Sequence, residues 1–253
     1  MLEYPEVVTV AKQLDENIAG KSVESVLPAT KPHKFCWFNG DVKNYCEKIA
    51  GNKVTKVKGF GMFVEICFDN GQALCFDDGV NVRLINDTSN LKDYQLLLKF
   101  CDGTALVFSV AMYGGILLHD ENYQYEYYVK SSQAISLLDN SFKKRFYEVL
   151  KDSKPNLSVK AFLATEQRFP GIGNGVLQDI LFCAKINPKR KISSLTDLET
   201  EDLLYCIKAV IADMVKKGGR DTEKDIFGNY GKYKTIMSKN TLNDGCPDCG
   251  SQI

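Results

Sequence analysis

The first twenty residues have the spacing of a one-sided helix. Apolar side chains recur there every three or four positions, at Val7, Val10, Leu14 and Ile18. Pro5 suits the first turn of a helix, and Gly20 supplies a stop. The pattern predicts an N-terminal helix that packs one face on a core.

Short strand-like runs follow this helix. They cover residues 22–28, 53–68, 72–76, 80–85, 94–100 and 105–113. The turns Asp69-Asn70-Gly71 and Asp102-Gly103 are typical of hairpins, and residues 41–50 predict a short helix between strands. We therefore expect an antiparallel β layer of sandwich type with a helix at its N-terminus.

A polar, tyrosine-rich connection at 121–140 separates the strand patterns from helical ones. Asn140 or Ser141 is expected to cap the helix that follows, and the Thr196–Glu199 capping box opens a long helix. The sequence thus predicts an α+β fold in three parts. These are a β-sandwich domain at 1–130, a helical domain at 131–240 and a short tail at 241–253.

Residues 158–194 hold two short helical patterns around a glycine turn, Gly171-Ile172-Gly173-Asn174. Pro170 is expected to end the first helix, and Asn174 to cap the second. Glycines let a backbone approach a ligand closely, and a helix N-terminus attracts phosphate. Side-chain donors surround the turn: Gln167, Arg168, Lys185, Lys189, Arg190 and Lys191. Taken alone, the turn also fits a plain helical hairpin with a solvated basic end.

Composition describes a globular chain of 253 residues, with 44% hydrophobic and 25% charged residues. The formal net charge is zero, but it divides unevenly. Residues 141–253 hold 19 Lys and Arg against 14 Asp and Glu, whereas residues 1–140 hold 13 against 18. A neutral protein can still present a basic face to nucleic acid, and the helical half has the modest excess that this requires.

Nothing in the sequence indicates a membrane or export signal. No apolar run approaches the roughly 20 residues that span a bilayer, and the N-terminus lacks a basic segment followed by an apolar one. We expect a cytoplasmic monomer with no membrane partner.

Nine cysteines are present, an odd number. Seven are scattered among apolar neighbours and are expected to be reduced, buried, small hydrophobic residues. Cys246 and Cys249 are instead candidate metal ligands, because CPDCG is half of a zinc-ribbon pattern.

The segment GIGNGVLQDILF, followed by INPKRKISSL, resembles the helix-two-turn-helix element of the formamidopyrimidine-DNA glycosylase and endonuclease VIII family. The order of helix, β-sandwich, helical hairpin and CxxC is similar to that family along nearly the whole chain. The resemblance implies that Asn174 holds a DNA phosphate, with Gly171 and Gly173 allowing close approach. Gln167 stands where many relatives have a lysine, so Arg168 is expected to replace that contact.

The catalytic N-terminus departs from the family. Relatives use a proline at position 2 as an amine nucleophile, followed by a glutamate that moves protons at the sugar. Here the chain begins Met1-Leu2-Glu3, and Leu2 cannot act as a secondary amine. Glu3 and Glu6 match the family pattern, and Met1 supplies the free amine if it is retained. The resemblance therefore implies a monofunctional glycosylase in which Glu3 polarises water, with little strand-cleaving lyase activity.

Other family positions are also altered. Phe60 stands at a catalytic lysine position, with Lys58 nearby as a replacement. Val80 corresponds to a methionine that fills the gap left by a flipped base, and Tyr113 or Met112 to a further wedge. Each of these also fits an ordinary packing residue. The loop at 219–245, which includes Arg220, is expected on the surface, and its place in the family suggests that it faces DNA or the lesion.

The resemblance extends to a C-terminal zinc finger that relatives build from two CxxC pairs. Cys246 and Cys249 form one pair, and two thiolates are too few for a closed zinc site. We expect zinc only if a second pair lies beyond Ile253, and no other cofactor.

Three functions fit these observations. The first is a DNA-repair glycosylase that hydrolyses the bond to a flipped-out damaged base in duplex DNA. The second is a catalytically silent protein that binds lesions or unusual DNA structures on the same scaffold. The third, an RNA-binding protein, is disfavoured by the β-sandwich.

Overall fold

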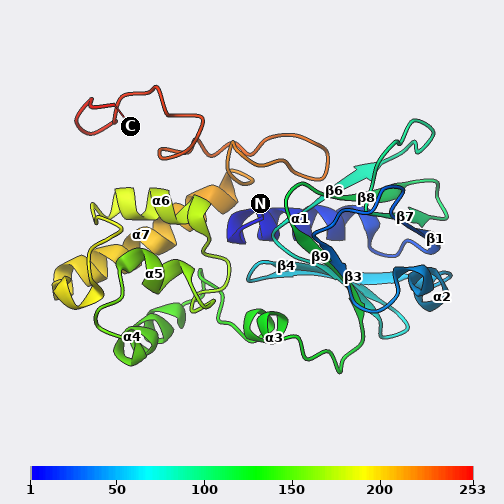
Figure 1. Cartoon of the computed structure of the whole chain (residues 1–253), viewed down its shortest axis with the longest axis horizontal. Coiled ribbons are helices and arrows are strands. Elements are labelled where there is room, and N and C mark those ends of the chain that lie inside the picture. Colours follow the sequence, from blue (N-terminus) through cyan, green and yellow to red (C-terminus); the bar gives the residue numbers. More distant parts are fainter. Residues whose placement is uncertain (1, 253) are drawn as a thin grey trace.

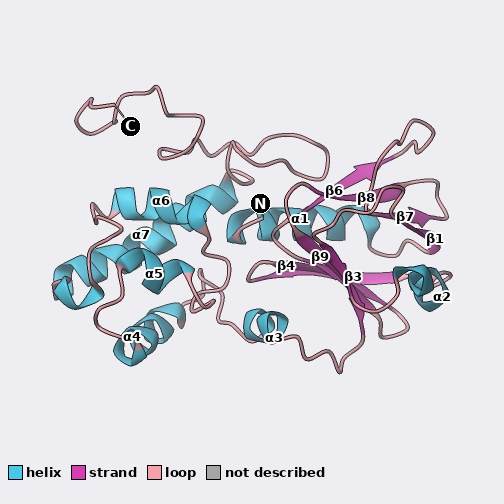
Figure 2. Cartoon of the chain, in the orientation of Figure 1, coloured by secondary structure: helices cyan, strands magenta, loops and turns pink. Residues whose placement is uncertain are grey.

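The computed structural model describes residues 2–252, which form a β part and a helical part (Figure 1). Helix α1 (Tyr4–Ile18) starts at the junction of the two parts and runs along the β part. Figure 2 shows that the strands gather on one side of the molecule and most helices on the other. The expected α+β class is therefore confirmed.

The β part consists of two sheets. The four-stranded sheet has the order β1-β7-β8-β6, and the five-stranded sheet has the order β2-β9-β5-β4-β3. The strands of the first are β1 (Val23–Pro28), β6 (Val80–Ile85), β7 (Leu96–Phe100) and β8 (Ala105–Val110). The strands of the second are β2 (Cys36–Phe38), β3 (Val54–Phe60), β4 (Phe63–Phe68), β5 (Ala73–Phe76) and β9 (Gly114–His119). The short helices η1 (Val42–Asn44) and α2 (Tyr45–Ile49) lie where residues 41–50 predicted them.

One hydrophobic core lies between the sheets and under α1. The predicted helix face contributes Val7, Val10, Leu14 and Ile18, all at most 2% exposed. Gly59 on β3 allows the close approach of α1, since a Cβ there would lie 2.8 Å from the carbonyl oxygen of Val7. The helix is thus held against the sheet by shape as well as by apolar burial.

The helical part has its own core. Its helices are α3 (Glu126–Ser132), α4 (Phe142–Asp152), α5 (Val159–Ala164), α6 (Asn174–Cys183), η2 (Ile192–Ser194) and α7 (Asp197–Lys216). Four phenylalanines pack edge-on, tilted or stacked at its centre: Phe142, Phe146, Phe162 and Phe169. The capping box predicted at Thr196 and Glu199 is present at the start of α7. Beyond α7 the described chain has loops and turns as far as Gln252.

Several expectations need correction. Strand β2 pairs with β9 in parallel, so the β layer is not wholly antiparallel. The sequence patterns missed β2 and β9, and α3 lies inside the segment expected to be a plain connection. Ser141 stands at the N-cap of α4, but its side chain makes no capping bond and instead contacts Asp139.

The cysteines are less buried than expected. All nine are free thiols, but among the seven scattered ones only Cys75 and Cys206 are buried. Cys101 and Cys183 are exposed because they lie at a turn after β7 and at the end of α6.

No helix among residues 2–252 has both the length and the apolar content needed to cross a membrane.

Candidate functional site

The first residues of α1 join the two parts of the molecule through a buried carboxylate. Glu3 is 1% exposed and lies at the N-terminus of α6. Its Oε1 accepts the backbone N–H of Gly175 at 2.8 Å, and its Oε2 accepts that of Val176 at 2.7 Å. The amides at the start of a helix favour an anion, so Glu3 stabilises the turn that was expected to attract phosphate.

Arg220 completes this cluster from the loop after α7. Its backbone N–H and Nε both donate to Glu6 Oε1 at 3.0 Å, and its Nη2 donates to Glu6 Oε2 at 2.7 Å. Its Nη1 also lies 3.5 Å from Glu3 Oε2. Arg220 is 3% exposed and already pairs with Glu6 and Glu3, and its contact with DNA stays a prediction. A buried guanidinium here is required to neutralise two buried carboxylates.

Burial and neighbouring charges shift the pKa values of Glu3 and Arg220. Burial raises the pKa of Glu3, although the charge of Arg220 and the two backbone amides oppose this rise. Burial also disfavours the charge of Arg220, but Glu6 and Glu3 outweigh it and raise the arginine's pKa. We call Glu3, Glu6 and Arg220 the junction cluster.

The glycines of the turn are explained by contacts inside the protein. A Cβ on Gly173 would lie 2.5 Å from Glu3 Oε1, and one on Gly175 would lie 1.5 Å from Arg220 Nη1. Gly171 has a φ of +99° and packs on Tyr4, whose N–H donates to the Gly171 carbonyl. Close approach of DNA to Gly171 and Gly173 stays a prediction, because these internal contacts already require glycine.

Asn174 is the first residue of α6, and Gly173 is the N-cap, so the expected capping role of Asn174 is wrong. The side chain of Asn174 is exposed. It borders a groove of about 540 Å³ that is also lined by Lys160, Gln178, Lys185 and Met237. Asn174 is thus open to an external partner, although its contact with phosphate stays a prediction.

Two of the other expected donors, Arg168 and Gln167, already bond to protein groups. Arg168 donates to the carbonyl oxygens of Ala161 and Thr165 at the end of α5, and it pairs with Glu166 at 2.6 Å. The side-chain carbonyl of Gln167 accepts the hydroxyl of Ser131 at 3.1 Å. These bonds hold the turn in a conformation with positive φ at Glu166 and Gln167.

Lys58 already pairs with a protein carboxylate, and its role as a replacement for the missing lysine at position 60 stays a prediction. Its Nζ donates to Glu65 at 2.9 Å, on the five-stranded sheet. Phe60 packs against Phe63 and Tyr128. Phe60 on β3 is therefore a packing residue, because its ring belongs to an aromatic cluster.

An exposed apolar rim lies beside the junction. Met112 is 67% exposed, Tyr113 36%, and Trp37 lies 6.4 Å from the Tyr113 ring. The pKa of Tyr113 is raised first by the charge of Asp78, then by burial, and the charge of Glu3 adds to the rise. Tyr113 and Met112 are therefore open to an external partner, and their role as a wedge stays a prediction. Val80 is fully buried at the start of β6, so it cannot fill that role.

Sequence reasoning missed two acidic residues. Asp78 accepts the N–H of Leu2 through its backbone carbonyl at 2.8 Å, which brings it to the start of the chain. Burial, the charge of Asp77 and that of Glu3 raise the pKa of the Asp78 carboxyl to about 6. Asp77 accepts the N–H of Gly115. In the sequence, Asp-Asp-Gly after a strand is indistinguishable from an ordinary turn, so no signal pointed to these residues.

Two of the expected site features lie at the chain ends. Met1 lies outside the described residues. Cys246 and Cys249 form a tight turn in which the Gly250 N–H donates to the Cys246 carbonyl. Bonds from Ser251 lower the pKa of Cys249, which suits a metal-binding thiolate. The pair offers two of the four ligands that a closed zinc site needs.

Known proteins are similar to this chain in sequence along its whole length. No family model matches the chain. Formamidopyrimidine-DNA glycosylase of Streptococcus agalactiae serotype III is 26% identical over 264 aligned residues, covering 100% of this chain and 93% of that protein. The enzyme of the same name from Lactococcus lactis subsp. cremoris is 24% identical, with the same coverage of both chains.

Solved structures agree on the fold. The complex of Lactococcus lactis Fpg with DNA containing an abasic site superposes with a TM-score of 0.82 at 21% identity, covering 99% of this chain and 92% of that chain. Its complex with FAPY-dG DNA also gives a TM-score of 0.82 at 21% identity, with coverage of 99% and 93%.

The chain therefore has the two-part α+β fold of a DNA glycosylase, with the chain start at the junction. The resemblance to formamidopyrimidine-DNA glycosylase and its family is confirmed in sequence and in fold.

Proposed function

We propose that this protein is a base-excision-repair glycosylase that binds damaged duplex DNA and hydrolyses the bond to a flipped-out damaged base. The observation that carries the proposal is similarity along the whole chain to formamidopyrimidine-DNA glycosylases, combined with a buried Glu3 at the start of the chain. An enzyme of this kind must extrude the base and then attack C1′ of its sugar.

The reaction is proposed to use water rather than an enzyme amine. Leu2 is 4% exposed, its side chain packs in the β core and its backbone N–H donates to the Asp78 carbonyl oxygen, so it does not supply the secondary amine of a proline. Two carboxyls lie near the chain start and have raised pKa values, Glu3 and Asp78. Glu3 remains our first candidate for the group that polarises water. Asp78, whose carboxyl has a pKa of about 6, is the second.

Binding is proposed to involve the exposed Asn174 at the start of α6 and the exposed rim of Met112 and Tyr113. Asn174 would contact a phosphate, and the rim would fill the space left by the extruded base. Lys58, Arg168 and Gln167 are proposed to act indirectly, because each already bonds to a protein group.

A catalytically silent lesion binder is the second candidate. One specific observation favours it, since both oxygens of Glu3 already accept backbone N–H groups. A carboxylate that is saturated in this way is a poor base unless DNA binding opens the turn.

The remaining expectations stay proposals. A division near residue 130 is supported by two separate hydrophobic cores, although Ile226 of the later loop packs in the first. Zinc at Cys246 and Cys249 would require two further ligands. We also retain a monomeric state and a cytoplasmic location as proposals.

The deciding experiment uses labelled duplexes that carry 8-oxoguanine, formamidopyrimidine, an oxidised pyrimidine, an alkylated purine or an abasic site. Each reaction is divided, and one half is heated in alkali. Strand breaks only after alkali would establish hydrolysis without lyase chemistry. Breaks without alkali would show that an amine acts despite Leu2. Tight binding to one lesion with no break on any of them would favour the silent candidate.

A further inference from the structure

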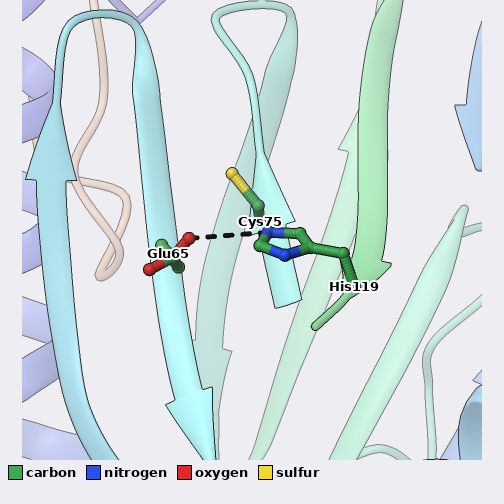
Figure 3. Close-up of side chains that lie close together, drawn as sticks. All are labelled: Glu65, Cys75 and His119. Atoms are coloured by element: carbon green, nitrogen blue, oxygen red, sulfur yellow. Dashed lines mark ion pairs between the residues drawn. The ribbon is translucent and has the colours of Figure 1, made fainter. Parts of the chain in front are cut away.

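A second buried polar cluster lies away from the junction, on the five-stranded sheet (Figure 3). It contains Glu65 of β4, Cys75 of β5 and His119 at the end of β9, all at most 6% exposed. Glu65 pairs directly with Cys75 across the strands, and His119 pairs with Ala73 two residues from Cys75. The three side chains therefore share one face of the sheet. We call them the sheet cluster.

This face is not the main core. The neighbours that alternate with the cluster, such as Val64, Ile66 and Leu74, belong to the core between the two sheets. The sheet cluster is covered instead by the tyrosine-rich segment. The rings of Tyr123 and Tyr128 lie 4.5 Å and 4.8 Å from that of His119.

The imidazole of His119 has one satisfied and one unsatisfied nitrogen. Its Nδ1 lies 2.9 Å from the carbonyl oxygen of Asp120, which can only accept, so Nδ1 carries a hydrogen. Its Nε2 is buried and has no hydrogen-bond partner among residues 2–252. In the neutral ring Nε2 is then a lone pair, and a backbone carbonyl on the other nitrogen is the usual way to orient a metal-binding histidine.

This lone pair faces a carboxylate. His119 Nε2 lies 3.5 Å from Glu65 Oε2, as Figure 3 shows. Two electron-rich atoms at that distance repel each other, and either a proton on Nε2 or a bound metal ion would remove the repulsion. In a tetrahedral zinc site, oxygen and nitrogen ligands lie about 3.4 Å from one another and sulfur about 3.6 Å from either. The ligand atoms of all three residues lie within 4.8 Å of one another, so small side-chain rotations bring Cys75 into range.

We propose that Glu65, Cys75 and His119 bind a divalent transition-metal ion, with zinc as the metal that the ligand set fits best. A carboxylate, an imidazole and a thiolate are the three ligand types of zinc sites, whereas magnesium and calcium require oxygen ligands throughout. A water molecule would complete the tetrahedron.

The surroundings favour an ion that stabilises structure. Tyr128 donates to Glu65 Oε2 at 2.5 Å and Lys58 donates to Oε1 at 2.9 Å, so the carboxylate is oriented from two sides. The ion would tie β4, β5 and β9 together beneath α3. It would not take part in base release, because the junction cluster is built from other elements.

The test uses cobalt(II), whose thiolate complexes absorb in the near ultraviolet. Because Cys246 and Cys249 would also bind cobalt, the full chain carries Cys246→Ser and Cys249→Ser. We expect one cobalt per chain, a thiolate charge-transfer band and visible bands of tetrahedral intensity. Cys75→Ser is expected to abolish the charge-transfer band, and His119→Gln to weaken cobalt binding roughly tenfold or more.

Cys67→Ser is the matched control. Its sulfur lies 3.5 Å from the other oxygen of Glu65 and is not one of the three ligands, so the band is expected to persist. Zinc at about 100 times its dissociation constant is expected to raise the Tm of the same background by roughly 5–10 °C.

The proposal is overturned if the background shows no thiolate band, or if the band survives Cys75→Ser and disappears in Cys67→Ser. It is also overturned if zinc leaves the Tm unchanged, in which case a shared proton occupies the space between His119 and Glu65. If Cys75→Ser does not fold, His119→Gln decides the matter, since unchanged cobalt affinity in that variant contradicts the site.

Discussion

The junction cluster and the sheet cluster are both buried sets of polar or charged side chains. They differ in whether every polar atom has a hydrogen-bond partner. In the junction cluster, Arg220 and two backbone amides supply donors to all four oxygens of Glu3 and Glu6. In the sheet cluster, Lys58 and Tyr128 satisfy Glu65, whereas Nε2 of His119 has no hydrogen-bond partner among the described residues.

The difference indicates what each cluster does. A buried network in which every group has a partner fixes one arrangement of the chain, here the start of α1 against the start of α6. A buried nitrogen without a partner costs free energy unless something binds it. The first cluster therefore positions a site, and the second indicates a bound ion.

The largest effect is expected from Arg220→Met, which leaves two carboxylates buried without a counter-charge. We expect a loss of about 3–5 kcal/mol in the free energy of unfolding, measured by urea denaturation. Arg190→Met is the matched control, because Arg190 also forms a two-point pair with Glu199, but each side chain is 33% exposed. That variant is expected to lose about 1 kcal/mol or less. Equal losses in the two variants would show that the junction cluster is not a buried network.

Lowering the pH is expected to reduce the free energy of unfolding by a smaller amount. Burial would raise the pKa of Glu65, but His119, which lies 3.5 Å away without a hydrogen bond, and the bonds from Tyr128 and Lys58 outweigh it and lower the pKa to about 2, against an ordinary value of 4.5. Because the folded-state pKa is the lower one, the stabilisation is complete above about pH 5 and is lost as the pH falls toward 2. It amounts to about 3 kcal/mol in full, of which about 2 kcal/mol is lost between pH 6 and pH 3.

The measurement compares urea denaturation at pH 6 and pH 3 in the presence of a chelator. Glu65→Gln is expected to reduce the drop in stability between these pH values. Asp102 and Glu199 also have pKa values of about 2, and they contribute to the residual drop. An identical drop in the variant and the parent would contradict the assigned contacts of Glu65.

Asn174→Ala tests whether the face beside the junction cluster binds DNA. Loss of one phosphate contact is worth about 1 kcal/mol, so the dissociation constant for a lesion duplex is expected to rise roughly fivefold. Gln178→Ala is the control, since Gln178 is also exposed on α6 and borders the same groove. The same change in the dissociation constant in both variants would show that DNA binds to another face of the protein.

The smallest effect is expected from Arg168→Ala. Arg168 bonds to carbonyl oxygens at the end of α5, so its loss is expected to lower the unfolding free energy by about 0.5–1 kcal/mol. Duplex affinity, measured by fluorescence anisotropy, is expected to change less than twofold. A larger loss of affinity without a loss of stability would restore Arg168 as a phosphate ligand.

The sequence predicted most of the fold because its patterns are local. The face of α1, the Asp-Asn-Gly hairpin and the Thr196–Glu199 capping box each depend on a few adjacent residues, and the structure contains all three. Strand β9 was missed because GGILLH has no alternation, since all six residues are buried.

The site was less accessible to sequence reasoning. The glycine turn was identified from its local pattern, whereas Glu3 and the phosphate role of Asn174 were identified from the family resemblance. The pairing of Arg220 with Glu6, at a separation of 214 residues, has no local signature. The sheet cluster also depends on strand register, which brings Glu65 opposite Cys75 and carries His119 into range from β9.

The most direct test of the proposed function measures release of free base from the best lesion duplex under single-turnover conditions, with borohydride present in a parallel reaction. We predict base release without a covalent protein–DNA adduct in the parent protein. Glu3→Gln or Asp78→Asn should abolish release, with folding of each variant verified by its Tm. Borohydride trapping of an adduct, or full release by both variants, would contradict hydrolysis by a carboxylate and water.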